Sequence, residues 1–575
     1  MKTRNQTSLD SEKRERVELM EKVWLKNYQP GVPAVIDPAR FASLNEMFLE
    51  TCNRFKDKAA FTNLNQAITF AELEEKTRFF AAYLQSALGL KIGDRIALMM
   101  PNLLQYPIAL FGALRAGLIV VNVNPLYTPR ELEYQLSDAE CDAIIVLANF
   151  ANTLAKVLKK VKIKHIIVTE VGDILPFPKA LLVNWVVKYL KKMVPAWKIP
   201  GHQKFREALA LGAKQKFVKP IITGEDIAFL QYTGGTTGIA KGAMLTHRNM
   251  VANIEQTSAW IKPAVKPGEE IIITALPLYH IFSLTANCFT FMRVGALNVL
   301  ITNPRDIKGF IKILGRYRFT AITGVNTLFN ALLNQPAFAN LDFSALRIAL
   351  GGGMSIQRAV ALRWKAITKV PLLEAYGLTE TCPAVCINPF NLKDYNGSIG
   401  LPISSTDICI RDDRGLELGF NTPGELCVRG PQVMRGYWKL HVDTEDVLQD
   451  GWLRTGDIAT VDEEGYVRIV DRKKNMILVS GFNVYPNEVE DVIAMMPQVL
   501  EVAVIGVPRE DGEKVKAFIV KKDPHLTAEW VKEYCHTQLT GYKVPKEIEF
   551  CSELPKSNVG KILHRVLREK EKLEK

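Results

Sequence analysis

The sequence predicts a multidomain α/β protein in which helices cover mostly parallel sheets. Its 575 residues are too many for one ordinary hydrophobic core, so we expect at least two domains. In the first half, helical patterns alternate with short β-branched runs, an order typical of parallel sheets. Near residue 400, short strands separated by turn signals replace this alternation and indicate a β-rich subdomain.

The individual elements are predicted from hydrophobic periodicity. The helix–strand cycles of the first half are 71–90 with 95–100, 108–116 with 118–123, and 131–139 with 143–148. The strands of the β-rich subdomain are 407–411, 425–429 and 466–470. The last part combines helices at 486–495 and 528–539 with strands at 501–506 and 515–521, which indicates a small α+β domain.

The charged tetrapeptide Asp471-Arg472-Lys473-Lys474 marks a boundary before this small domain. We expect an N-terminal extension over 1–40 and a large domain over 41–470, whose β-rich part covers about 400–470. The boundary at 471–474 is followed by the C-terminal domain over 475–575.

Charge and cysteine usage narrow the range of partners and compartments. The formal net charge of +12 suits nucleic acid, a membrane surface or small polyanions. No nucleic-acid-binding motif accompanies it, so we expect no nucleic acid partner. The nine cysteines are scattered, which favours a reducing, cytoplasmic compartment. We expect neither a signal peptide nor a membrane-spanning helix, because the N-terminus is polar and no apolar run is long enough.

Segment 178–200 comes closest to a membrane-binding sequence. It combines apolar residues and the aromatic Trp185, Tyr189 and Trp197 with interspersed lysines. Such a helix can lie along an anionic membrane surface, here the inner face of the cytoplasmic membrane. An amphipathic helix packed on its own domain, with its lysines merely solvated, fits the pattern equally well, and the sequence leaves both open.

A loop rich in glycine and threonine follows the apolar run 227–230. It is Tyr232-Thr233-Gly234-Gly235-Thr236-Thr237-Gly238-Ile239-Ala240-Lys241-Gly242. Glycines let main-chain N–H groups converge on an anion, while hydroxyls and the lysine add donors and charge. The loop therefore favours a polyphosphate, although its spacing is neither the Walker pattern nor Gly-x-Gly-x-x-Gly. The alternative is a glycine-rich hairpin without a ligand.

With five further motifs, this loop resembles the signatures of the adenylate-forming superfamily, which covers acyl-CoA synthetases, firefly luciferase and peptide-synthetase adenylation domains. The motifs are AYGLTET at 375–381, GWLRTGD at 451–457, DRKK at 471–474, GFNVYP at 481–486 and PKSNVGK at 555–561. They occur in the family's order, and the resemblance runs from about Phe41 to Arg568. Within the superfamily the sequence is most similar to bacterial long-chain-fatty-acid–CoA ligases.

The resemblance implies a site for ATP and Mg²⁺. Residues 232–238 and Lys241 would hold the phosphates, and the hydroxyl of Thr236 and the carboxylate of Glu380 would ligate Mg²⁺. The implied adenosine-binding residues are Gly352, Gly353, Tyr376, Gly377, Thr379, Asp457 and Arg472, of which Tyr376 would stack on adenine and Asp457 would accept the ribose hydroxyls. Without the family context, Glu380 suits a helix N-terminus, Tyr376 a core and Asp457 a turn cap.

The resemblance also assigns catalytic roles. Lys561 would carry the first half-reaction, because a carboxylate that attacks the α-phosphate brings two anions together and an ammonium offsets their charge. The alternative is a solvated lysine at the start of the last helix. His280 would shape the acyl entrance, or is a satisfied core histidine. Lys474 would lie at the hinge about which the C-terminal domain moves, and Gly481 would leave room for the pantetheine arm of coenzyme A.

Two positions depart from the family pattern. Serine usually stands where this chain has Gly234, and proline where it has Ala240. The first departure removes a hydroxyl near the phosphates and the second loosens the loop. We expect both to affect nucleotide affinity more than activity.

The expected function is an ATP-dependent long-chain fatty-acid–CoA ligase with fatty acid, ATP and coenzyme A as substrates. A ligase for medium-chain, aryl or other carboxylates is the first alternative, and a non-catalytic ATP-binding protein at the membrane is the second. A homodimer is compatible with the sequence, which does not determine the oligomeric state.

Overall fold

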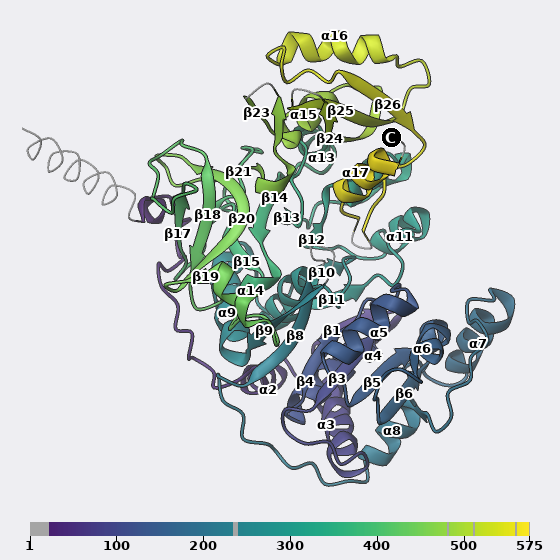
Figure 1. The fold of residues 1–575 in the computed structure, drawn as a ribbon. Helices are drawn as coiled ribbons and strands as arrows, with labels where there is room; N and C mark the ends of the chain where they lie inside the picture. Colours follow the sequence, from purple (N-terminus) through teal and green to yellow (C-terminus); the bar gives the residue numbers. More distant parts are fainter. Residues whose placement is uncertain (1–21, 234–239, 480–481, 510–511, 558–559, 574–575) are drawn as a thin grey trace, which may run out of the picture.

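The computed structural model describes residues 22–573 except 234–239, 480–481, 510–511 and 558–559 (Figure 1). The large N-terminal part contains three β-sheets of seven, nine and five strands. A small α+β unit lies at one end of the molecule. The α/β class with parallel sheets, a large N-terminal domain and a small C-terminal domain is confirmed.

The first large sheet is seven-stranded, in the order β7-β6-β5-β3-β4-β8-β9. All neighbours in it are parallel except β8 and β9. Its strands are β3 (Arg95–Met99), β4 (Ile119–Asn122), β5 (Ala143–Leu147), β6 (His165–Thr169), β7 (Gln203–Lys204), β8 (Ile227–Thr233) and β9 (Lys241–Thr246). The glycine-rich loop thus joins the antiparallel pair β8–β9 at the edge of the sheet.

The helices of this part confirm the predicted helix–strand alternation. They are α2 (Leu44–Arg54), α3 (Phe70–Ser86), α4 (Gln105–Arg115), α5 (Pro129–Asp138), η2 (Ala148–Phe150), α6 (Ala151–Val157), α8 (Phe205–Gly212), α9 (His247–Ile261) and η4 (Lys262–Ala264). Thr69 and Glu72 form a capping box at the start of α3, which satisfies free N–H groups of the first turn. Helix α3 ends at Ser86, before the predicted Leu90, because Gly89 turns the chain with a φ of +66°.

The second large sheet is nine-stranded, in the order β16-β15-β14-β13-β12-β10-β11-β1-β2, with a parallel centre and antiparallel edges. Its strands are β1 (Ala59–Asn63), β2 (Gln66–Thr69), β10 (Ile271–Thr274), β11 (Leu297–Leu300), β12 (Ala321–Gly324), β13 (Ile348–Gly351), β14 (Leu372–Gly377), β15 (Ala384–Ile387) and β16 (Leu401–Pro402). Its helices are α10 (Ile281–Ser283), η5 (Leu284–Phe291), α11 (Ile307–Leu314), α12 (Asn326–Leu333), η6 (Pro336–Asn340), α13 (Arg358–Thr368) and η7 (Thr379–Thr381).

The predicted β-rich part is a five-stranded antiparallel sheet. It comprises β17 (Asp407–Arg411), β18 (Gly424–Arg429), β19 (Leu448–Gln449), β20 (Trp452–Val461) and β21 (Val467–Arg472), with α14 (His441–Val447) inserted. Strand β21 extends two residues beyond the predicted 470. The described part of the N-terminal stretch packs beside this sheet: Trp24 of η1 (Val23–Asn27) lies in the same apolar core, and the Tyr28 hydroxyl donates to the Pro402 carbonyl at 2.5 Å.

The C-terminal unit has an apolar core of its own, which includes Val489, Val502, Ile519 and Val531. Its elements are η8 (Lys473–Asn475), β22 (Ile477–Val479), β23 (Phe482–Val484), α15 (Pro486–Ala494), β24 (Val499–Arg509), β25 (Gly512–Lys521), α16 (Ala528–Gln538), β26 (Glu547–Cys551) and α17 (His564–Leu573). In Figure 1 these elements lie at the opposite end of the molecule from β3–β6. The predicted helices and strands of this part are present, with β24 and β25 longer than expected.

Segment 178–200 begins with α7 (Lys179–Trp185), which continues as the π-helical turn η3 (Val186–Leu190). Of the residues in these two elements only Ala180 is buried, so this helix is not packed into the core. Farther along the segment, Ile199 lies in the apolar core of the first sheet and Trp197 packs against that core. Among the described residues, no helix combines the length and apolar character needed to cross a bilayer.

Candidate active site

The carboxyl ends of β13 and β14 place Gly352 and Gly353 beside the AYGLTET motif. A Cβ at Gly352 would lie 2.9 Å from the Ala375 carbonyl oxygen and 3.2 Å from the Phe282 ring. A Cβ at Gly377 would lie 1.9 Å from the Pro383 carbonyl oxygen. Glycine at these two positions lets the main chain approach closely, and Gly353 adopts a φ of +77° that side chains disfavour.

Tyr376, Asp457 and Arg472 form one hydrogen-bonded cluster. The Tyr376 hydroxyl donates to Asp457 Oδ2 at 2.6 Å, and Arg472 Nε lies 3.1 Å from Asp457 Oδ1. Asp457 and Arg472 are register partners on β20 and β21. Burial, and then the Asp457 charge, raise the pKa of the Tyr376 hydroxyl well above its ordinary value, so Tyr376 is the hydrogen-bond donor to the carboxylate at neutral pH.

Lys561, on the C-terminal unit, lies near enough to this cluster for the charges of Arg472 and Asp457 to act on its ammonium. Its amide donates to Ser557 Oγ at 3.1 Å, and its carbonyl accepts from the Ser557 amide at 2.7 Å, so Ser557 and Lys561 lie side by side. Burial, followed by the positive charge of Arg472, lowers the pKa of the half-buried Lys561 to about 8. The structure thus brings the PKSNVGK motif at 555–561 near the GWLRTGD motif at 451–457 and the DRKK motif at 471–474.

The positive charge of Lys561 also affects the pKa of His280. Burial and then the Lys561 charge lower the pKa of His280 to about 4, so the imidazole is neutral at pH 7. Its Nδ1 accepts a hydrogen bond from the Phe282 amide at 3.4 Å at the start of α10. An uncharged imidazole that is hydrogen-bonded to its own chain is suited to line the acyl entrance, where a charged group would be unfavourable.

A second cluster surrounds Lys241 at the start of β9. Lys241 pairs with Asp443 on α14, and its Nζ lies 5.2 Å from the centre of the Tyr437 ring. The Tyr437 hydroxyl donates to Glu380 Oε1 at 2.7 Å. Sequence reasoning predicted Lys241 and Glu380 but missed Tyr437 and Asp443, because no local pattern distinguishes these two from ordinary surface residues.

The glycine-rich loop itself is only partly described. Gly234, Gly235, Thr236, Thr237 and Gly238 lie outside the described residues, as does Gly481. At the ends of the loop, Thr233 pairs with Lys241 in the β8–β9 ladder. The Tyr232 side chain points into the core of the first sheet, where its hydroxyl donates to Asp138 Oδ2 at 2.5 Å, so any contact of Tyr232 with a ligand involves its main chain. Thr379 lies in the 3₁₀ turn η7 beside Glu380.

The 471–474 boundary joins the two parts through charged and polar contacts. Asp471 Oδ2 accepts the Asn487 amide of α15 at 3.0 Å, and Arg568 Nη1 donates to the Lys474 carbonyl at 3.1 Å. Burial, followed by the nearby Arg472 charge, lowers the pKa of Lys474 to about 8. Lys473 reaches back to Asp413 of the β-rich sheet at 2.6 Å.

Comparison with known proteins agrees with this arrangement. Residues 48–438 match the AMP-binding enzyme family, and residues 488–561 match the AMP-binding enzyme C-terminal domain. The long-chain-fatty-acid–CoA ligase of Yersinia pestis is 61% identical over 553 residues, covering 96% of this chain and 98% of that protein. The long-chain-fatty-acid–CoA ligase of Bacillus subtilis (strain 168) is 38% identical over 555 residues, covering 96% and 98%.

Solved structures show the same fold. The anthranilate CoA ligase AuaEII in complex with anthranoyl-AMP superposes with a TM-score of 0.83 at 24% identity, over 94% of this chain and 99% of that chain. ATP-bound MatB from Rhodopseudomonas palustris superposes with a TM-score of 0.75 at 27% identity, over 92% and 100%. The chain therefore belongs to the AMP-binding enzyme family, and its resemblance to the adenylate-forming superfamily is confirmed.

Asp443 competes with any phosphate that binds Lys241. We expect Asp443→Asn to lower the dissociation constant for ATP by about two- to fivefold, because a partly exposed ion pair is worth little and its loss frees the ammonium. Calorimetric titration of ATP in EDTA measures this without metal. Asp446→Asn, an equal charge change at an exposed position of the same helix, is the control. Weaker ATP binding by Asp443→Asn would instead mean that Asp443 holds Lys241 in its binding position.

Proposed function

We propose that this protein is an ATP-dependent long-chain-fatty-acid–CoA ligase, which forms an acyl-adenylate and pyrophosphate and then acyl-CoA and AMP. The proposal depends on the position of Lys561. This residue belongs to the C-terminal unit but lies close enough to Asp457 and Arg472 on the large unit for their charges to shift its pKa. The acyl class is supported by relatives at 55–61% identity that are long-chain-fatty-acid–CoA ligases.

In the first half-reaction, a carboxylate oxygen of the fatty acid attacks the α-phosphorus of ATP. The new O–P bond forms as the bond between that phosphorus and the bridging oxygen breaks, and pyrophosphate leaves with the electron pair. Lys561 offsets the negative charge where the two anions meet. Asp457 accepts the ribose hydroxyls, Arg472 supports Asp457, and Tyr376 offers adenine a flat face.

The phosphates would be held by the 232–238 loop and Lys241. Mg²⁺ suits the same region, because the Glu380 carboxylate is a hard oxygen donor that the Tyr437 hydroxyl orients beside Lys241. Glu380 and Thr236 would hold the ion, which neutralises phosphate charge when bound. The role of Lys241 is to position the triphosphate by charge, without entering the bond changes.

In the second half-reaction, the thiol of coenzyme A loses its proton and attacks the acyl carbonyl carbon, and AMP leaves. This step needs different surroundings, so the C-terminal unit rotates about 471–474, withdraws Lys561 and brings the Gly481 loop to the site. The neutral His280 lines the acyl entrance throughout. All residues named for the two steps come from one chain, so the proposal does not depend on a dimer.

Substrate class is tested by acid-dependent pyrophosphate exchange across fatty acids of increasing length. We expect kcat/KM to rise with chain length into the long-chain range, because each buried methylene contributes about 0.8 kcal/mol. A maximum at short-chain or aromatic acids would select the alternative carboxylate ligases of this family. Absence of exchange with every acid, in protein that binds ATP, would select the non-catalytic alternative.

Lys561 is tested by separating the two half-reactions. We expect Lys561→Ala to abolish acyl-adenylate formation and to spare thioester formation from pre-made acyl-AMP. The pH profile adds a second measurement: only the ammonium form offsets charge, so kcat/KM for ATP falls as pH rises through about 8, the pKa of Lys561. Lys561→Arg, whose guanidinium stays charged throughout the usable pH range, moves this limb to higher pH.

Equal loss of both half-reactions in Lys561→Ala would contradict the assignment. A profile that is unchanged in Lys561→Arg would assign the alkaline limb to another group, of which Lys474 is the first candidate because its pKa is also about 8.

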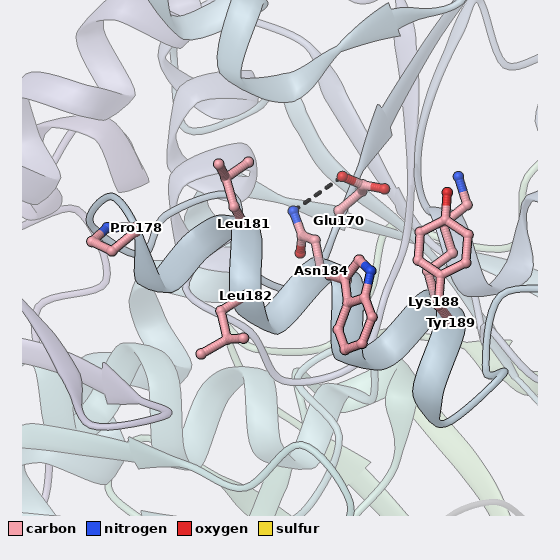
Figure 2. Close-up of a pocket in the computed structure, with 8 residues that line it drawn as sticks. Glu170, Pro178, Leu181, Leu182, Asn184, Lys188 and Tyr189 are labelled. Atoms are coloured by element: carbon pink, nitrogen blue, oxygen red, sulfur yellow. Dashed lines mark hydrogen bonds between the residues drawn. The ribbon is translucent and has the colours of Figure 1, made fainter.

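We further propose that segment 178–200 gives this cytoplasmic protein a peripheral contact with an anionic membrane surface. Trp185, Tyr189 and Leu182 are 54%, 58% and 61% exposed, which is unusual for residues of their size. Both polar atoms of the Asn184 amide anchor the helix. Nδ2 donates to Glu170 (Figure 2), and Oδ1 accepts from the Gly172 amide. Exposed lysines follow at 188, 191, 192 and 198, and they complement anionic headgroups.

An open groove of about 570 Å³ lies along this helix between Leu181, Leu182, Trp185 and Tyr189. We expect Leu182→Ser combined with Trp185→Ser to abolish sedimentation with phosphatidylglycerol vesicles, because the buried apolar area is lost. Pyrophosphate exchange with a water-soluble acid stays unchanged. Trp530→Ser, at a position 44% exposed on α16, is the matched control. Sedimentation equal to that of the unaltered protein would refute the contact.

A further inference from the structure

Two side chains of α12 donate hydrogen bonds across the boundary to the C-terminal unit. Thr327 Oγ1 donates to the Gly560 carbonyl at 2.9 Å, and Asn330 Nδ2 donates to the Leu500 carbonyl at 2.9 Å. The two donors are three residues apart on one helix, so they share a face. Both acceptors are main-chain carbonyl oxygens. Whether the two hydrogen bonds form therefore depends on the position of the C-terminal backbone and not on the identity of its side chains.

Asn330 is oriented before it makes this contact. Its Oδ1 accepts from Arg363 Nη1 at 3.3 Å and from Asn334 Nδ2 at 3.1 Å, which leaves Nδ2 directed at Leu500. The side chain is only 8% exposed. The amide donor is thus preoriented toward the Leu500 carbonyl, which modestly favours the position of the C-terminal unit that supplies this acceptor.

Thr327 acts next to the reactive lysine. Its acceptor is the carbonyl of Gly560, the residue before Lys561, and Gly560 adopts a φ of +86°. A Cβ at Gly560 would lie 2.7 Å from Thr327 Oγ1 and 3.3 Å from a methyl carbon of Val325. The glycine thus lets the turn sit against α12, and the hydrogen bond fixes the peptide plane from which the Lys561 side chain extends.

We propose that Thr327 and Asn330 are positioning residues that select the adenylate-forming orientation of the C-terminal unit. This inference rests on the proposed function, since it concerns the orientation that delivers Lys561. Both bonds break when the unit rotates for thioester formation. Neutral hydrogen bonds that water can replace contribute little each, so the pair shifts the balance between two orientations without locking one.

The test compares the two half-reactions in Thr327→Val and Asn330→Asp. Valine keeps the size of threonine without the hydroxyl, and aspartate keeps the acceptor toward Arg363 but places an oxygen opposite the Leu500 carbonyl. We expect each variant to lower kcat of adenylate formation by about two- to tenfold. The KM for ATP stays unchanged, because the nucleotide binds mainly to the large unit. Thioester formation from pre-made acyl-AMP keeps its rate or becomes faster.

Thr327→Ser retains the hydroxyl and restores adenylate formation. Thermal unfolding of each variant separates loss of positioning from loss of folding. Equal slowing of both half-reactions in folded variants, or no slowing of the first, would overturn the inference. Lys561→Ala in the same assay keeps the two proposals apart: if it abolishes adenylate formation while Thr327→Val and Asn330→Asp do not slow it, only the positioning role fails. If Lys561→Ala retains adenylate formation, the proposed function fails instead.

Discussion

The buried carboxylate of Asp457 is the charge on which the candidate site depends. It is 3% exposed, and such a group is stable only with partners. The Tyr376 hydroxyl and Arg472 are two of these partners. The negative charge of Asp457 also attracts the Lys561 ammonium, which lies on the other side of the domain boundary. One carboxylate therefore interacts with residues of motifs that are far apart in the chain, on both sides of the domain boundary.

Positive charge exceeds negative charge around this carboxylate. Arg472, Lys474 and Lys561 lie within reach of one another, and their mutual repulsion adds to burial in lowering the pKa values of both lysines to about 8. Under the proposed function, the triphosphate of ATP balances these cations. Nucleotide binding then favours the orientation that brings Lys561 close, and departure of pyrophosphate weakens it. Electrostatics thus couples the chemical step to the position of the domain.

The interactions at the boundary between the two units differ in kind from those inside each unit. The C-terminal unit is held together by its own apolar core around Val489 and Ile519. Its contacts with α12 are hydrogen bonds to the carbonyls of Gly560 and Leu500. Apolar burial stabilises each unit by many additive contacts, whereas hydrogen bonds exchange readily with water. Such a boundary can open without unfolding either side, as a two-orientation mechanism requires.

The sequence determined the elements and the motifs. The helix predicted over 71–90 is present over 70–86, because its periodic apolar face is a local signal, and the parallel sheets followed from helix–strand alternation. The resemblance supplied the candidate roles of Glu380 and Lys561. Only the tertiary structure identified the partners: Asp443 lies 202 positions from Lys241 and Thr327 lies 233 from Gly560. Periodicity describes the neighbourhood of a residue along the chain, whereas these pairs form only when packing of separate elements brings distant segments together.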